Sequence, residues 1–198
     1  MNFYFDEPIW LISQFFAFIA FIFSIWSFQV KNKVKMLFLI GTFSINLAIS
    51  ATLLENYSLG ALFGLAAIRN FVFCYLDWRV SVGKHVPRWL SYVFAGIFAA
   101  ATITGTTLLW HTGMALWLEV LICVTLLGLI WGNIQKGTNL MRISFIANRT
   151  FNIINHVYFN NVIAVIIAAS AITSNLVFYL REYIAYKKKK ASSQENPL

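Results

Sequence analysis

The stretch PIWLISQFFAFIAFIFSIWSFQV at residues 8–30 decides the fold class, because it carries no charged side chain along its whole length. An apolar run of about 20 residues is long enough to cross the hydrocarbon core of a bilayer as one helix. Runs of comparable length recur along the chain. The sequence therefore predicts seven transmembrane helices, near residues 8–30, 34–54, 58–77, 88–111, 113–133, 138–158 and 161–186.

The composition also indicates a membrane protein. Hydrophobic residues make up 60% of the chain and charged residues only 11%, whereas about a quarter of the residues in a soluble domain are charged. No segment is long and polar enough to form a second, soluble domain. We expect one all-α membrane domain at residues 1–186, followed by a basic, disordered cytoplasmic tail at residues 187–198.

The basic residues lie in short patches beside the apolar runs, and Lys136 and Arg142 make up one of these patches. The loops after the first, third and fifth runs and the C-terminal tail are basic. The N-terminus and the other loops contain no Lys or Arg. By the positive-inside rule, this pattern places the N-terminus outside and the C-terminus in the cytoplasm. The patches predict topology and contact with lipid headgroups, not binding of nucleic acid.

Comparison of the chain with itself at an offset of 105 residues indicates an internal repeat. Without a gap, Trp26 aligns with Trp131 and Asn70 with Asn175, and loops and basic patches stay in phase. We expect two parallel three-helix repeats, 8–78 and 113–183, joined by one inverting linker helix at 88–111. In transporters built from parallel repeats, the substrate site lies at the repeat interface near the middle of the membrane.

Three charged residues fall inside the predicted helices. Arg69 and Arg149 lie near the middle of the third and sixth helices, and Glu119 lies in the fifth. A central arginine costs at least about 2.5 kcal/mol to insert, so it should face the bundle interior and have a partner. One reading is a structural ion pair of Glu119 with either arginine. The other is a surplus positive charge that faces a cavity and attracts an anionic or phosphate-bearing solute.

Polar residues also gather on the sixth helix and at equivalent places in the two repeats. Arg149, Asn152 and His156 recur at spacings of three and four residues, which puts them on one helix face that could line a solute path. His156 is either a proton relay or an ordinary hydrogen-bonded histidine. Asn70 and Asn175 should face each other across the central axis, where they either bind solute or pack the helices together.

Motifs for catalysis are missing from the sequence. It has no glycine-rich phosphate loop, no spaced cluster of metal ligands and no convincing nucleophile–base pair. Cys74 and Cys123 both fall inside apolar runs, where we interpret them as small packing residues. We therefore expect a protein that is not an enzyme and has no cofactor and no metal.

Three short segments resemble the YgjV-like family of bacterial inner-membrane proteins: SFQVKNK at 27–33, AIRN at 67–70 and Met141-Arg142. The resemblance covers nearly the whole chain before the tail and implies a place in the bacterial inner membrane more than an activity. The architecture is similar to SWEET sugar transporters and PnuC-type vitamin-precursor transporters. In SWEETs an asparagine pair on helices 3 and 7 contacts substrate, and Asn70 and Asn175 match it by helix and by repeat phase. The helix prolines that serve as hinges in SWEETs have no counterpart here.

Together these features predict a small-solute transporter or facilitator, with a site between the two repeats. The expected partners are the lipid bilayer and an unknown small solute, with no nucleic acid, and a homo-oligomer is left open. The alternative is a non-transporting inner-membrane scaffold or lipid-binding protein. The predicted site residues are Asn70, Asn175, Arg69, Arg149, Asn152, Glu119 and His156.

Overall fold

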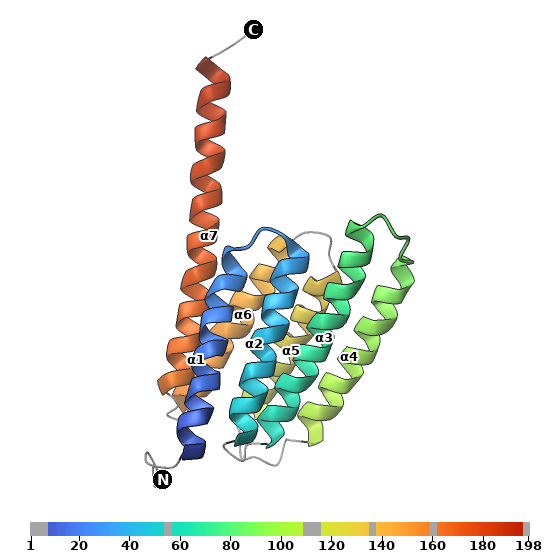
Figure 1. The fold of residues 1–198 in the computed structure, drawn as a ribbon, viewed down its shortest axis with the longest axis vertical. Coiled ribbons are helices and arrows are strands. Elements are labelled where there is room, and N and C mark those ends of the chain that lie inside the picture. The colour runs from blue at the N-terminus through green and yellow to red at the C-terminus, as the bar shows by residue number, and fades with distance from the viewer. Residues whose placement is uncertain (1–7, 54–56, 109–115, 135–137, 159–161, 196–198) are drawn as a thin grey trace.

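The computed structural model describes residues 8–53, 57–108, 116–134, 138–158 and 162–195, and the regular structure in these ranges is entirely α-helical. This confirms the predicted all-α fold with seven helices (Figure 1). In chain order the helices are α1 (Pro8–Gln29), α2 (Lys33–Leu53), α3 (Tyr57–Ser81), α4 (Arg88–Leu108), α5 (Leu116–Ile134), α6 (Thr138–Tyr158) and α7 (Val162–Glu195).

Local signals explain where several helices begin and end. The Asn32 side chain accepts a hydrogen bond from the backbone N–H of Lys35 at 3.2 Å and so caps the start of α2. Gly83, with a φ of 77°, turns the chain away after α3. α7 differs from the expectation, because it continues to Glu195 where we predicted a disordered tail from residue 187. Its last turns, at residues 187–195, contain four lysines, Ala191, Gln194 and Glu195, all good helix formers, and two serines.

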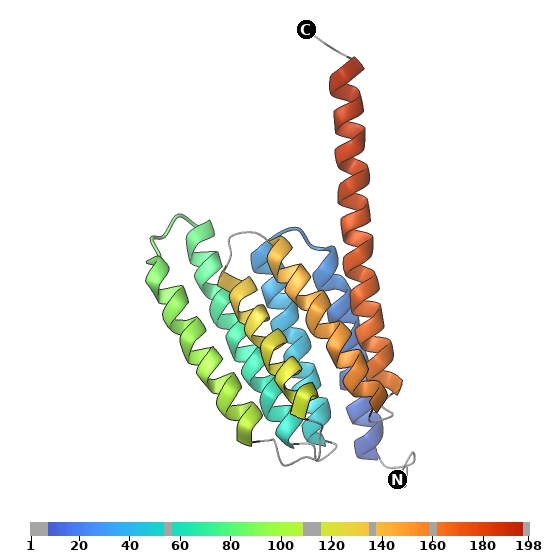
Figure 2. The ribbon, with the colours of Figure 1, turned by 180° about the vertical axis from the view of Figure 1, so that it is seen from behind.

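The helices form two layers. α1, α2 and α3 lie side by side in the layer that faces the viewer in Figure 1, and α7, α6 and α5 lie behind them, as the reverse view in Figure 2 shows. Between the layers, α1 contacts α7 and α3 contacts α5. α4 lies at one side edge of the two layers, against α3 and α5.

The outer surface of this bundle is apolar. Large side chains such as Phe15, Trp89 and Leu180 are more than half exposed, as expected where lipid replaces water. Among the described residues, four helical segments are long and apolar enough to cross a membrane: Pro8–Gln29, Lys33–Leu53, Gly60–Ser81 and Val165–Lys187. The chain therefore has the helices of a membrane protein, and spans by α4, α5 and α6 remain predictions.

Within the rear layer, α5 and α6 lie close together at Gly132. A Cβ atom added to Gly132 would lie 2.9 Å from the Cα atom of Met141, which belongs to the backbone of α6. Backbone cannot move aside as a side chain can, so this crossing requires a residue without a side chain. Small residues at helix crossings are the usual way in which membrane helices gain packing contacts.

We expect Gly132→Ala to lower the stability of the protein by about 1–3 kcal/mol, because the added methyl group overpacks the α5–α6 crossing. The measurement is the thermal unfolding temperature of the purified protein in detergent. Gly96→Ala is the matched control, since a Cβ atom at Gly96 in α4 meets nothing within 4 Å. Equal melting of the two variants would show that the crossing tolerates the extra volume.

Candidate functional site

The first part of the candidate site lies where α3 meets α5. Arg69 and Asn70 of α3 are both buried, with 6% and 1% of their surface exposed. Nη2 of Arg69 donates a long hydrogen bond of 3.5 Å to Oδ1 of Asn70, and Nδ2 of Asn133 on α5 donates to the same oxygen at 3.4 Å. Nε of Arg69 and Nδ2 of Asn70 have no hydrogen-bond partner among the residues that the structure describes. The α3–α5 junction therefore contains buried hydrogen-bond donors that could bind a further acceptor.

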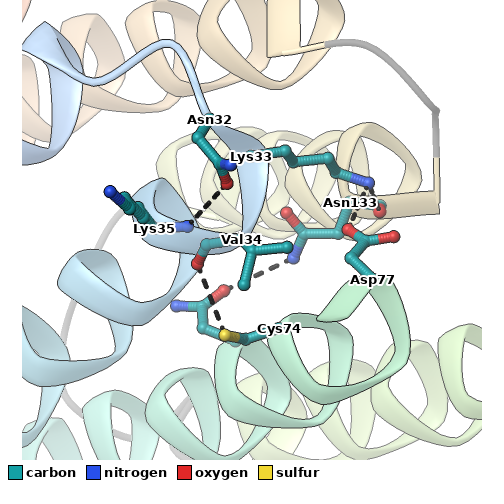
Figure 3. Close-up of polar contacts among 8 residues, drawn as sticks. Asn32, Lys33, Val34, Lys35, Cys74, Asp77 and Asn133 are labelled. Carbon is teal, nitrogen blue, oxygen red and sulfur yellow. Dashed lines mark hydrogen bonds and ion pairs between the residues drawn. The ribbon is translucent and has the colours of Figure 1, made fainter. Parts of the chain in front are cut away.

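Lys33 extends this cluster toward the connection between α1 and α2 (Figure 3). Its Nζ atom donates to the backbone carbonyl of Asn133 at 2.7 Å and forms an ion pair with the Asp77 carboxylate at 2.8 Å. A cation at this position complements the negative end of the α5 dipole and satisfies one of its terminal carbonyls. Lys33 thus joins the start of α2 to the ends of α3 and α5.

Arg142, at the start of α6, occupies the corresponding place at the other junction between the layers. Its side chain is completely buried. Nη1 donates to the carbonyl of Phe28 and Nη2 to that of Val30, and Cζ lies 3.7 Å from the centroid of the Phe178 ring. The sequence grouped Arg142 with the basic residues that contact lipid headgroups. That interpretation is wrong, because the guanidinium is buried in the bundle and donates hydrogen bonds to carbonyls at the end of α1.

Gln29 provides a second link at the α1–α7 junction. Its Nε2 atom donates to the hydroxyl of Ser174 at 2.8 Å and to the carbonyl of the same residue at 3.1 Å. Its Oε1 atom accepts a hydrogen bond of 2.9 Å from Nη1 of Arg181. Lys31 and Glu182 form an ion pair nearby. Polar contacts therefore hold α1 to α7 at the same end of the bundle as the Lys33 cluster.

Arg149 lies on α6, where α6 faces α2. It is buried, with 6% of its surface exposed, and its Cζ atom is 4.9 Å from the ring centroids of both Phe43 and Phe145. Phe43 belongs to α2, so the guanidinium contacts both layers. None of the described residues accepts a hydrogen bond from its Nε atom. The two aromatic faces stabilise part of the positive charge but accept no hydrogen bond from Nε.

Neither mid-helix arginine forms an ion pair with any acidic side chain that the structure describes. The partner expected for them, Glu119, has its backbone in α5, but its side chain lies outside the described part of the chain. The side chains of Asn152 and His156 on α6 also lie outside it. The pairing of Glu119 and the polar stripe on α6 therefore stay predictions.

The equivalent asparagines, Asn70 and Asn175, are not joined to each other by a hydrogen bond. Asn175 is fully buried, and its Nδ2 atom donates to the carbonyl of Ala171 on its own helix at 3.0 Å. α3 and α7 lie at opposite corners of the two layers (Figures 1 and 2). Each asparagine keeps one buried amide atom that no described residue pairs with, Nδ2 in Asn70 and Oδ1 in Asn175.

Asn133 and Arg142 are among the junction residues that sequence reasoning missed. A lone asparagine at the end of an apolar run was the available signal for Asn133. Arg142 had no such signal, because a basic residue beside a membrane span is also what topology requires. Chemically, the buried groups offer hydrogen-bond donors and positive charge. No cluster of three or more His, Cys, Asp or Glu side chains suited to a metal occurs among the described residues.

Replacing Arg142 by alanine should destabilise the protein strongly. The change leaves the carbonyls at the end of α1 unpaired and opens a cavity beside Phe178, and each lost charged hydrogen bond is worth about 1.5–3 kcal/mol. Thermal unfolding in detergent measures the effect, and Arg88→Ala, an exposed arginine at the start of α4, is the control. A melting temperature for Arg142→Ala no lower than that of Arg88→Ala contradicts this assignment.

Comparison with known proteins gives one finding for the chain. The family model Imp-YgjV, described as a bacterial inner membrane protein, matches residues 11–185. The match includes α2 to α6 entirely and most of α1 and α7. Searches of curated proteins and of solved structures found no match. The chain therefore belongs to the Imp-YgjV family of bacterial inner membrane proteins.

Proposed function

We propose that this protein is a small-solute transporter or facilitator whose solute carries a negative charge. The observation that carries the proposal is the state of Arg69 and Arg149. Both are buried inside a membrane bundle. Among the described residues, neither Nε atom has a hydrogen-bond partner and neither arginine pairs with an acidic side chain. An intramembrane charge in this state is a functional-site hypothesis by default.

A carboxylate or phosphate group is the natural complement to these arginines. The guanidinium presents its donors as a planar fork that matches two oxygen atoms of such a group. Arg149 has the rings of Phe43 and Phe145 as partial compensation. Within the described part of the chain, Arg69 has only the amide oxygen of Asn70, at 3.5 Å, as a hydrogen-bond acceptor. We therefore assign Arg69 the stronger role in holding the anion and Arg149 a supporting role from the opposite layer.

The pattern of neighbouring helices supports the proposed repeat. In the proposed repeat, α1, α2 and α3 correspond to α5, α6 and α7. When each helix is replaced by its counterpart, the α1–α2, α2–α3 and α1–α7 contacts become α5–α6, α6–α7 and α5–α3 contacts. All of these contacts are present. Phe28 and Asn133, whose carbonyls are capped by Arg142 and Lys33, are also 105 positions apart. Two parallel trios joined by α4 form a plan that transporters use.

The charge pattern supports a topology with the N-terminus outside and the C-terminus in the cytoplasm. The connections α1–α2 and α3–α4 and the extension of α7 lie at one end of the molecule (Figure 1). These are the segments that carry the basic patches. We propose seven crossings of the bacterial inner membrane on this basis.

Reporter fusions test the topology. A fluorescent protein fused to the C-terminus should be bright, and alkaline phosphatase at the same place should be inactive, because the cytoplasm is reducing. The opposite results are expected for fusions at Leu53, which ends α2 at the other end of the bundle. Active phosphatase at the C-terminus would reverse the proposed orientation.

Anion binding is tested by thermal shift of the purified protein against matched sets of carboxylates, phosphate monoesters and neutral sugars. At least one anion should raise the melting temperature, since a ligand that binds only the folded state stabilises it. Arg69→Gln should abolish this shift and Arg149→Gln should weaken it. The exposed Arg88→Gln carries the same charge change and should leave the shift intact.

Two results would contradict the proposal. One is a protein that no anion stabilises, and the other is a shift that survives Arg69→Gln. If Glu119→Gln also lowers the melting temperature as much as Arg149→Gln does, these residues form a structural ion pair. The alternative of a non-transporting scaffold then becomes the better description. The crosswise contacts of Lys33 and Arg142, which hold the two layers together, favour that alternative.

A further inference from the structure

An apolar groove with a volume of about 620 Å³ lies along the first three helices. Its lining side chains point away from the bundle interior, since Trp26, Phe38 and Tyr75 are each more than half exposed. The groove is therefore on the outer face of the α1–α2–α3 layer and would open onto lipid. It is separate from the polar junctions between the layers, so an occupant of the groove is independent of the function proposed above.

Close packing of α3 against α2 shapes this groove. Gly41 lets the Phe71 ring press against α2, since a Cβ atom added there would lie 2.8 Å from the ring. Phe71 in turn meets the Phe38 ring edge to face, with centroids 5.8 Å apart. Further along, Sγ of Cys74 donates to the carbonyl of Val34 at 3.4 Å. Aromatic side chains and the smaller Cys74 line this apolar hollow.

Among the described residues, the charges at the groove that have no partner of opposite sign are positive. Lys35 is exposed and lines the groove, and Arg79 lies against the groove residue Tyr75. Nη1 of Arg79 donates to the Tyr75 hydroxyl at 3.4 Å, while its Nε atom is buried and has no hydrogen-bond partner in the described part of the chain. The neighbouring lysines differ, because Lys31 and Lys33 are paired with acidic residues. Neither Lys35 nor Arg79 pairs with an acidic side chain among those described.

We propose that this groove binds a phospholipid with an anionic headgroup. One acyl chain fills the apolar hollow between α1 and α3, and the phosphate lies between Lys35 and Arg79. Trp26 and Trp78 flank the same end, as expected of aromatic side chains at the depth of the headgroups. In the proposed topology this end faces the cytoplasm, where basic residues attract anionic lipid.

Native mass spectrometry of the full chain tests the proposal. The protein is loaded in detergent with an equimolar mixture of phosphatidylglycerol and phosphatidylethanolamine that have identical chains, and the bound lipids are counted. The unmodified protein should retain mainly phosphatidylglycerol. The double variant Lys35→Gln, Arg79→Gln should lower this preference by about ten-fold. The reason is that each basic residue near an anionic lipid raises the affinity for it on the order of several-fold.

Two further variants make the test specific. Lys84→Gln with Arg88→Gln removes the same charge from exposed positions that do not line the groove, and it should keep the preference. Cys74→Trp fills the hollow and should reduce retention of both lipids. The proposal is overturned if the Lys35 and Arg79 variant keeps the preference, or if the Lys84 and Arg88 variant loses it equally. Full retention of both lipids by Cys74→Trp also overturns it.

Discussion

Cations at the ends of helices hold the two layers of this protein together. Lys33 of α2 donates to the last turn of α5, and Arg142 of α6 donates to the last turn of α1. Each layer therefore supplies a hydrogen-bond donor to the end of a helix in the other layer. In lipid, the hydrophobic effect does not drive helices to associate. Packing and interhelical hydrogen bonds must hold them together instead. A terminal carbonyl buried without a donor is costly, which makes the register of the two layers depend on these contacts.

Around this constraint the bundle separates its polar groups into two environments. The junctions between the layers contain Arg69, Asn70 and Asn133 on one side and Arg142, Gln29 and Ser174 on the other. The outer face is apolar, and the groove on α1, α2 and α3 has positive charge only at its end. An anionic solute between the layers and an anionic lipid outside them would therefore meet different residues. The two proposals can fail separately.

Some parts of the candidate site could be predicted from single residues, and others could not. Arg69 and Arg149 were recognisable because a charge within an apolar run is expensive, and both are buried as expected. Arg142 was misread, since a basic residue near a span end serves equally as a topology signal. The place of Asn70 depended on which helices became neighbours. It meets Asn133 of α5, a partner that a pattern within one helix does not reveal.

By itself, the sequence determined that the chain forms seven helices and belongs in a membrane, because span length and hydrophobicity are local properties. Its self-similarity at an offset of 105 residues predicted two parallel three-helix repeats, which stays a prediction. Only the tertiary structure decided which charges are buried partners and which remain unpaired. That outcome depends on distances between helices far apart in the chain, such as that from Arg142 to Phe28. Such distances arise from packing, which residue spacing along one helix does not encode.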